Sequence, residues 1–240
     1  MTRRYLITGG TSGIGRAVAA YLSERGHRVL ITGTSAATVG DALEAGVSEL
    51  GAVADVTDPR SVATAFDTAA AIFGGLDGVF ANAGIDGEGK AAQDLDPERY
   101  RQVMEVNAVG PLVVAQAAYR HLTRPGTLVI NASVNAIRPE AGFADYNASK
   151  AAALALAKTL ALEWSADGIS VTSVCPGYFP SRMTSDWLSD PITSRVLLQH
   201  IPAGRFGQLD EIGALLEFLL GPQAPFLTGA AITIDGGRNI

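Results

Sequence analysis

The alternation of short apolar runs with amphipathic stretches is the feature that most constrains how this chain can fold. Runs such as residues 28–33 are rich in β-branched residues, and stretches with helical periodicity separate them. This pattern is typical of βαβ units around a parallel sheet. Because parallel crossovers are right-handed, the units stack into an α/β, Rossmann-like doubly wound parallel sheet of about seven strands with helices on both faces. We predict strands at 5–8, 28–33, 52–55, 77–81, 127–132, 169–175 and 230–234, and helices at 13–25, 59–73, 97–122 (one long or two abutting), 146–165 and 209–220.

No linker divides the chain, so we expect one domain over residues 1–240. The longest stretch without a periodic pattern covers residues 176–207, and such long loops in a compact domain are usually functional. We predict that it is a lid over a ligand, with a floppy insertion as the alternative. Its large apolar side chains are Tyr178, Phe179, Met183, Trp187 and Leu188.

Composition excludes several classes of protein. The net charge of −6, without a basic cluster, argues against nucleic-acid binding, which depends on Lys and Arg neutralising phosphates. No segment reaches the roughly 18 apolar residues of a membrane helix. The single cysteine, Cys175, cannot form an internal disulfide or a cysteine-based metal cage. We therefore expect a cytoplasmic protein with no metal site.

A glycine-rich string, Thr8-Gly9-Gly10-Thr11-Ser12-Gly13-Ile14-Gly15, lies between the first predicted strand and its helix. Glycines there permit a tight turn and let backbone N–H groups approach a pyrophosphate at the helix N-terminus. In a chain with 27 glycines such a string is weak evidence alone, but its position favours a dinucleotide site over an ordinary turn.

The end of the second strand should show which dinucleotide is bound. An acidic residue there would hold the ribose 2′-hydroxyl of NAD, but none precedes Asp41. A basic partner for a 2′-phosphate is also absent, both here and at Ser12. The hydroxyls of Thr34 and Ser35 can donate to a phosphate, so we favour NADP over NAD. The alternative is that both are ordinary turn residues.

Tyr146 and Lys150 lie four residues apart at the start of the strongest predicted helix, so they share one helical face. A nearby ammonium group should lower the pKa of the tyrosine from about 10 and make its hydroxyl a usable acid. The alternative is a surface pair on a helix. The sequence therefore predicts acid–base chemistry at this helix.

Further polar residues follow the carboxyl ends of neighbouring strands. Ser133 ends the fifth strand, where it could hydrogen-bond a substrate carbonyl. Asp55 ends the third strand and Asn82-Ala83-Gly84 ends the fourth, while Asn107 interrupts a predicted helix. Each alone is a common cap or turn residue, but their shared edge indicates a site.

On these motifs the whole chain resembles the compact, single-domain branch of the short-chain dehydrogenase/reductase family. The glycine string, Asn-Ala-Gly, Tyr-x-x-x-Lys, Pro176-Gly177 and the closing Asp235-Gly236-Gly237 all match its pattern. Residues 176–179 and 201–207 are most similar to bacterial β-ketoacyl-type reductases.

The resemblance implies four catalytic residues. Tyr146 would be the general acid/base, and Lys150 would bind the nicotinamide ribose and lower the pKa of the tyrosine. Ser133 would hold the substrate oxygen, and Asn107 would order a water in a proton relay. Such proteins are commonly homotetramers, with a homodimer as the alternative.

The resemblance also implies cofactor contacts: Asp55 and Val56 with adenine, and Phe179 and Ser181, the latter where Thr is usual, with the carboxamide. The cofactor contacts expected in total are Gly9, Thr11, Ser12, Gly13, Ile14, Gly15, Thr34, Ser35, Asp55, Val56, Asn82, Ala83, Gly84, Tyr146, Lys150, Pro176, Gly177, Phe179 and Ser181.

One departure bears on the substrate. Family members that act on acyl-carrier protein present arginines just before the fifth and sixth strands, where we place Thr127 and Asp167. We therefore expect an NADP-preferring ketoreductase that transfers a hydride between nicotinamide and a small, free carbonyl or alcohol substrate. The alternatives are an NAD-dependent secondary-alcohol dehydrogenase and a catalytically silent, nucleotide-sensing regulator.

Overall fold

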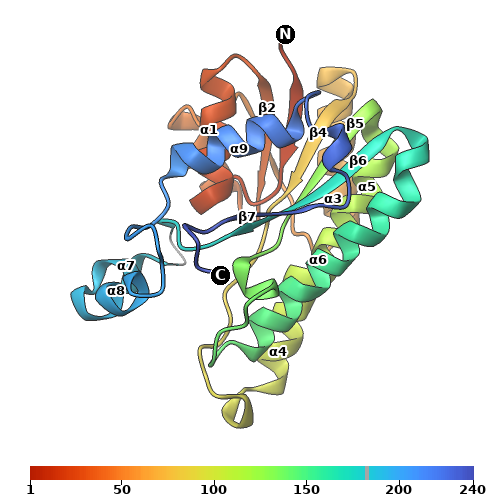
Figure 1. Ribbon diagram of the computed structural model, residues 1–240. Coiled ribbons are helices and arrows are strands. Elements are labelled where there is room, and N and C mark those ends of the chain that lie inside the picture. The colour runs from red at the N-terminus through yellow and green to blue at the C-terminus, as the bar shows by residue number, and fades with distance from the viewer. Residues whose placement is uncertain (182–183) are drawn as a thin grey trace.

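The computed structural model describes residues 1–181 and 184–240, and its central feature is one parallel sheet. The strand order is β3-β2-β1-β4-β5-β6-β7, and all neighbouring strands pair in parallel (Figure 1). The order reverses between β1 and β4, where doubly wound sheets open a crevice at the carboxyl ends of the strands. The strands are β1 (Arg4–Ile7), β2 (Arg28–Gly33), β3 (Leu50–Val53), β4 (Leu76–Ala81), β5 (Leu122–Asn131), β6 (Ile169–Pro176) and β7 (Ala231–Ile234).

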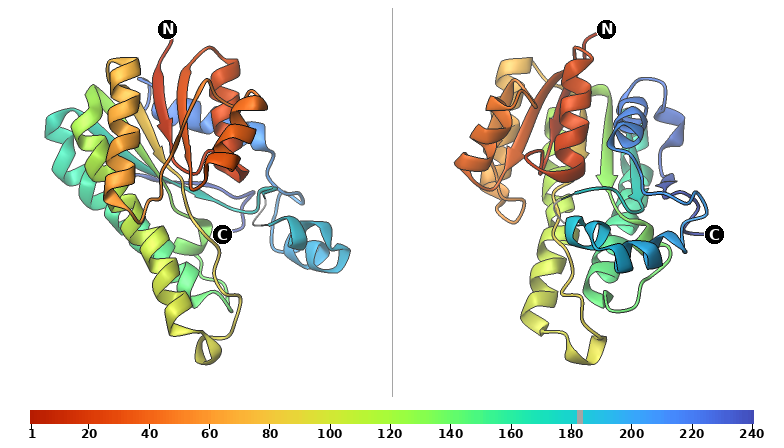
Figure 2. Two further views of the ribbon diagram at one scale, coloured as in Figure 1. Left: turned by 180° about the vertical axis from the view of Figure 1, so that it is seen from behind. Right: turned by 90° about the vertical axis from the view of Figure 1, so that its left-hand side faces the viewer.

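Helices cover both faces of the sheet, and each face has its own apolar core. Phe66, Val114 and Ala153 belong to the cluster under α3, α5 and α6, whereas Leu22 and Leu216 belong to the cluster under α1 and α9. Figure 1 shows α9 across one face, and the left view of Figure 2 shows the helices of the other. The predicted fold is confirmed. The helices are α1 (Gly13–Glu24), α2 (Ala36–Glu44), α3 (Pro59–Phe73), α4 (Pro97–Met104), α5 (Gly110–His121), α6 (Ala144–Trp164), α7 (Ser185–Ser189), α8 (Pro191–Leu198) and α9 (Leu209–Leu220).

Local sequence signals explain where several helices begin and end. Asp58 caps α3 by accepting a hydrogen bond from Arg60 N, Pro59 occupies the first turn, and Gly74 ends the helix with φ 75°. These are the residue types that such positions favour. Gln208 and Glu211 form a reciprocal capping box at the start of α9.

The predicted helix over 97–122 consists of α4 and α5 joined by a π-helical turn, Glu105–Val109. Asn107 lies on this turn. Its poor helix propensity predicted an interruption, and the wider turn provides it without ending the helical path.

Several sequence-based assignments differ from the structure. The strand predicted at 52–55 is β3 (Leu50–Val53), so Asp55 lies in the loop after it. α2 was missed because Thr38, Val39 and Gly40 weaken its helical signal. The stretch predicted to be irregular, 176–207, contains α7 and α8, which stand apart from the helical layers in Figures 1 and 2.

β5 begins earlier than the sequence predicted, and this changes which residue lies where carrier-dependent enzymes have an arginine. β5 begins at Leu122, and Thr127 lies within it, hydrogen-bonded through its hydroxyl to Ser170. Arg124 lies ahead of the segment that pairs with β6 from Gly126. An exposed arginine therefore does precede that segment of the strand, contrary to our expectation.

In the part of the chain that the structure describes, no helix combines the length and apolarity needed to cross a membrane.

Candidate active site

A cavity of about 740 Å³ opens at the carboxyl ends of the central strands. It brings together nearly all of the candidate residues, although they come from segments far apart in the sequence. Of the residues predicted from sequence, it is lined by Gly9, Thr11, Ser12, Gly13, Ile14, Thr34, Asp55, Val56, Asn82, Ala83, Gly84, Ser133, Tyr146, Lys150, Pro176, Gly177, Phe179 and Ser181. Gly15, Ser35 and Asn107 are not among its lining residues.

The glycine-rich loop is pressed against the loop after β4. A Cβ at Gly9, where φ is 64°, would lie 2.9 Å from Ala83 Cα, and one at Gly15 would lie 2.4 Å from Asn82 Nδ2. Asn82 Nδ2 donates to Thr8 O at 2.9 Å. Gly15 and Asn82 therefore shape the loop by close packing.

The N-terminus of α1 faces the cavity without a side-chain cap. Ser12 occupies the N-cap position but makes no capping hydrogen bond, and Gly13 and Ile14 follow at the start of the helix. The first N–H groups of a helix lack intrahelical partners and favour an anion. This cradle fits the pyrophosphate of a dinucleotide.

The end of β2 separates the two hydroxyls predicted to select NADP. Thr34 lines the cavity, whereas Ser35 caps α2 and its Oγ accepts from Thr38 N at 3.2 Å. A Cβ at Gly33 would lie only 2.6 Å from Thr11 Cγ2, so no larger residue fits there without moving the glycine-rich loop. Of the two predicted hydroxyls, Thr34 is therefore the one that faces the cavity.

The far end of the cavity contains Asp55 and Val56. Asp55 Oδ1 accepts from Thr57 N at 2.9 Å and from Thr57 Oγ1 at 2.8 Å, which fixes the loop after β3. Val56 is buried and packs close to Gly110. This rigid, partly apolar end suits a flat heterocycle.

Ser133, Tyr146 and Lys150 meet where β5 and α6 approach each other. Ser133 and Tyr146 both line the cavity, and Ser133 Oγ accepts from Asn135 N at 3.1 Å. Lys150 Nζ donates to Asn131 O at 2.8 Å and lies 5.7 Å from the centroid of the Tyr146 ring. Two hydroxyls and an ammonium group therefore lie together at the cavity.

Asn107 is fully buried and holds this site together from behind. Its Oδ1 accepts from Ile85 N at 2.8 Å, and its Nδ2 donates to Ile85 O at 2.9 Å and to Ser149 Oγ at 3.2 Å. All of these side-chain bonds connect the π-helical turn to the β4 loop and α6. The side chain therefore positions these elements.

Comparison with known proteins agrees with this geometry. A family model described as enoyl-(acyl carrier protein) reductase matches residues 9–239. The chain is 35% identical over 237 residues to cis-4-hydroxycyclohexanecarboxylate dehydrogenase of Sinomonas cyclohexanicum, covering 97% of this chain and 94% of that protein.

This chain belongs to the short-chain dehydrogenase/reductase family. It is therefore an NAD(P)-dependent oxidoreductase of that family.

Solved structures of other short-chain dehydrogenases superimpose on nearly the whole chain. A short-chain dehydrogenase from Burkholderia cenocepacia in complex with NADP has 34% identity and a TM-score of 0.89, covering 99% of this chain and 98% of that one. A 3-ketoacyl-(acyl-carrier-protein) reductase from Brucella melitensis complexed with NADH has 27% identity and a TM-score of 0.91, with the same coverage. Similar proteins thus bind either dinucleotide.

In this dehydrogenase, the pKa of Tyr146 differs from the sequence-based expectation. Burial raises the pKa of Tyr146 to about 12, with the hydrogen bond to Ser133 opposing and the charge of Asp86 adding to the rise. Burial also lowers the pKa of Lys150 to about 8. We expected the lysine to lower the pKa of the tyrosine, but in the free protein the loss of water around the phenol raises it.

A smaller pocket of about 70 Å³ adjoins the large cavity at Ser133 and Tyr146. Phe143 and Trp187 form part of its wall, with ring centroids 5.6 Å apart. Asn135 and Tyr178 line it too. Met183, predicted to line the substrate site, lies outside the described residues.

Two charged residues at this pocket, Glu140 and Arg238, were not predicted from the sequence. Tyr178 donates to Glu140 at 2.9 Å, and buried Arg238 donates to Glu140 Oε2 at 3.1 Å and to Asn135 Oδ1 at 3.4 Å. The guanidinium also lies 5.1 Å from the centroid of the Tyr178 ring. Because Glu140 and Arg238 are 98 residues apart, no local pattern could have linked them.

Over residues 1–181 and 184–240 no group of three His, Cys, Asp or Glu side chains is arranged to hold a metal ion.

Proposed function

We propose that this protein is an NADP-preferring ketoreductase that transfers a hydride between nicotinamide and a small carbonyl or alcohol substrate. The observation that carries the proposal is that Ser133 and Tyr146 line both cavities and so lie together at their junction. One cavity has the size and phosphate cradle of a dinucleotide site, and the other would take the rest of the substrate.

The nicotinamide ring supplies or accepts the hydride when the cofactor is bound. Ser133 donates a hydrogen bond to the substrate oxygen and stabilises the charge that develops there. Tyr146 gives its proton to that oxygen as the alcohol forms. Lys150 holds the nicotinamide ribose, and its ammonium group stabilises the tyrosinate that remains.

Burial raises the pKa of Tyr146 to about 12 in the free protein, which bears on its role as the proton donor. A phenol with this pKa keeps its proton throughout the physiological pH range, so the acid form that reduction needs is always present. Oxidation would need the phenolate, which burial and Asp86 oppose. An NAD-dependent secondary-alcohol dehydrogenase remains the alternative, and a regulator without turnover is the outcome if no ketone or alcohol reacts.

Cofactor choice is expected to depend on Thr34. With no acidic residue at the end of β2, we expect the wild type to use NADPH at least about tenfold better than NADH, the effect of one hydrogen bond to a charged phosphate. Thr34→Asp should reverse this preference, because like charges in a poorly solvated pocket repel strongly. The measurement is kcat/KM for both cofactors side by side, with Thr34→Asn as the uncharged control. A wild type that prefers NADH would show that the Thr34 and Ser35 hydroxyls do not select NADP.

The substrate is proposed to be a free compound of modest size. The pocket next to Tyr146 holds only about 70 Å³, and the net charge of −6 provides no general attraction for an acidic carrier protein. Arg124 restores one of the positive charges that carrier-dependent relatives present, but Asp167 keeps the other position acidic.

The segment 176–207 is proposed to close over the substrate. Trp187, on α7, forms part of the small pocket. We expect Trp187→Ala to raise KM more than it lowers kcat, because an apolar contact away from the reacting atoms binds ground and transition states alike. Ile192→Ala, at an exposed site on α8, is the control.

The same closure should be visible by hydrogen exchange. Amides of residues 184–196 should exchange fast in the free protein and slowly with cofactor and a substrate analogue. Equal protection of these amides from exchange in both states, together with unchanged Trp187→Ala kinetics, would show that the segment is an ordinary surface loop and does not close over the substrate.

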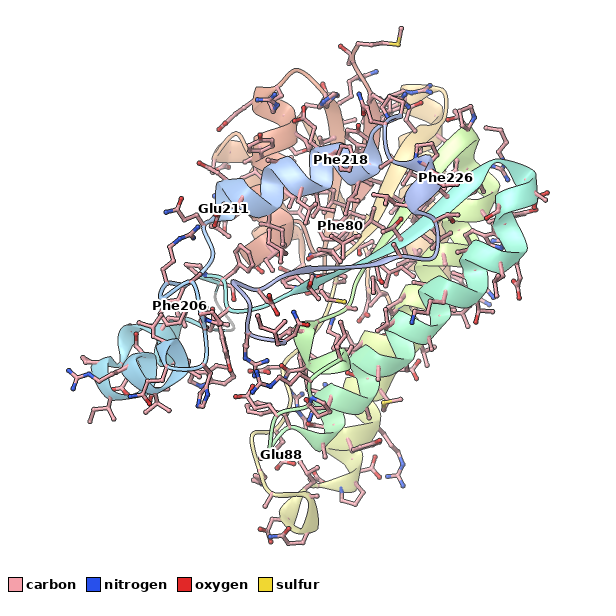
Figure 3. All side chains as sticks on the ribbon, in the orientation of Figure 1. Phe80, Glu88, Phe206, Glu211, Phe218 and Phe226 are labelled. Atoms are coloured by element: carbon pink, nitrogen blue, oxygen red, sulfur yellow. The ribbon has the colours of Figure 1, made fainter. Side chains whose placement is uncertain are left out.

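We also propose a cytoplasmic homotetramer, with a homodimer as the alternative. Large apolar side chains are exposed on helices of both faces of the sheet. Leu112 on α5 and Leu162 on α6 are exposed on one side. Phe218 on α9 is exposed on the other, as is Phe226 in the segment that follows α9 (Figure 3). Two such surfaces suit the two interfaces of a tetramer.

A further inference from the structure

The two cavities share a set of lining residues, and one of these, Asp86, has no part in the mechanism described so far. Asp86 lines both the large cavity and the small pocket, together with Ser133 and Tyr146. It lies in the loop that leaves the sheet after Phe80 and reaches Glu88 (Figure 3). The carboxylate is thus next to the place where the reacting oxygen of a substrate would bind.

The backbone around Asp86 is fixed on both sides. Ile85 is held by two hydrogen bonds to Asn107, at 2.8 and 2.9 Å, and Arg99 donates to Asp86 O at 2.8 Å. A Cβ at Gly87 would lie 3.1 Å from Tyr146 Cβ, so this glycine allows the loop to pack directly against the tyrosine. The position of the carboxylate is therefore set before any substrate binds.

Asp86 has no ion-pair partner among the described residues. Its Oδ1 accepts a hydrogen bond from Gly87 N at 2.9 Å, and across residues 1–181 and 184–240 no Lys or Arg forms a salt bridge with it. Burial raises the pKa of Asp86, and the more distant charge of Arg99 opposes this rise. Glu140, the other carboxylate of the small pocket, differs because Arg238 and Tyr178 bind it. Of these two carboxylates, Asp86 is thus the one with acceptor capacity left for a ligand.

Resting on the proposed function, we infer that Asp86 is a specificity-determining residue that accepts a hydrogen bond from a substrate hydroxyl next to the reacting carbon. The substrate class is therefore an α-hydroxy ketone, or in the reverse direction a vicinal diol. A half-buried carboxylate repels anionic substrates. A plain ketone has no hydrogen-bond donor, so it would leave the carboxylate without a hydrogen-bond partner. A hydroxyl satisfies it at a lower desolvation cost than an ammonium group does.

The test measures ligand binding, which does not require turnover. The ligands are trans-cyclohexane-1,2-diol, cyclohexanol, trans-2-aminocyclohexanol and 4-hydroxycyclohexanecarboxylate, titrated calorimetrically into the enzyme saturated with NADPH, with which an alcohol cannot react. The wild type should bind the diol at least about tenfold more tightly than cyclohexanol, as expected for a hydrogen bond to a charged group. In Asp86→Asn this ratio should fall several-fold, and binding of the carboxylate should improve.

Asp94→Asn provides the matched control, because it removes the same charge from an exposed position that lines neither cavity. Cofactor affinity should be equal in all three proteins, which shows that the site is intact. A diol-to-cyclohexanol ratio unaffected by Asp86→Asn would overturn the inference. Tighter binding of the amino alcohol than of the diol, lost in Asp86→Asn, would also overturn it by assigning the residue to cationic substrates.

Failure of the inference can be told apart from failure of the proposed function. If ketones are reduced but Asp86→Asn leaves the binding ratio unchanged, the function stands and the inference fails. If the binding ratio behaves as expected but no ketone or alcohol reacts with either cofactor, Asp86 still binds a ligand hydroxyl, but the ketoreductase proposal fails and with it the proposed substrate class.

Discussion

Replacing Tyr146 by Phe should lower ketone turnover by at least about 10²–10⁴-fold, the contribution typical of a general acid. The substitution removes one hydroxyl from a half-buried ring and leaves the packing of α6 in place. Ser133 would still hold the substrate oxygen, but no side chain would deliver the proton. We expect kcat to carry the loss while cofactor affinity, measured by fluorescence titration, changes little.

Tyr178→Phe is the matched control for this loss. Tyr178 also borders the small pocket and its pKa is likewise raised to about 12, but its hydroxyl is turned onto Glu140. Removing the Tyr178 hydroxyl should change KM but keep kcat within about tenfold of the wild-type value, because its contact does not involve the reacting oxygen. If Tyr146→Phe retained more than a tenth of wild-type activity, Tyr146 would not be the general acid.

Replacing Lys150 by Met should weaken cofactor binding by about 10–100-fold, the range for hydrogen bonds to a charged group, and lower kcat as well. Burial lowers the pKa of Lys150 to about 8 in the free protein. Its ammonium form is therefore complete well below pH 8 and is lost as the pH rises through that value. Cofactor affinity of the wild type should follow the same course, whereas affinity in Lys150→Met should be independent of pH in this window.

The measurement is the dissociation constant of NADPH between pH 6 and 10, with Lys158→Met as the control. Lys158 lies two turns later on α6 and is exposed, so its removal changes the net charge without touching the cavity. Equal pH dependence in wild type and Lys150→Met would contradict the assignment of this lysine to the cofactor.

The sheet and the arrangement of most site residues could be predicted because their signals are local. Tyr146 and Lys150 share one helical face by spacing alone, and the glycine string follows the first strand directly. Residues at the carboxyl ends of parallel strands must also gather at one edge. That rule predicted Ser133 and Asn82 at the same cavity, although 51 residues separate them.

The remaining features depend on tertiary contacts. The pKa of Tyr146 is set by burial, which its helical neighbours do not reveal. Arg238 reaches Glu140 from the far end of the chain. Asp86 could have been suspected, since it follows the Asn-Ala-Gly motif by two residues, but only the structure shows that two cavities meet beside it.

We expect a hydride to pass between nicotinamide C4 and a substrate carbonyl carbon while Tyr146 supplies the proton to the oxygen. The most direct test is to reduce a ketone with NADPH that carries deuterium on one face of C4, and then on the other, and to locate the label by NMR. Deuterium from one face only should appear on the carbinol carbon, and none should enter that carbon from D₂O. Deuterium from D₂O on the carbinol carbon, or no transfer from either face, would contradict this mechanism.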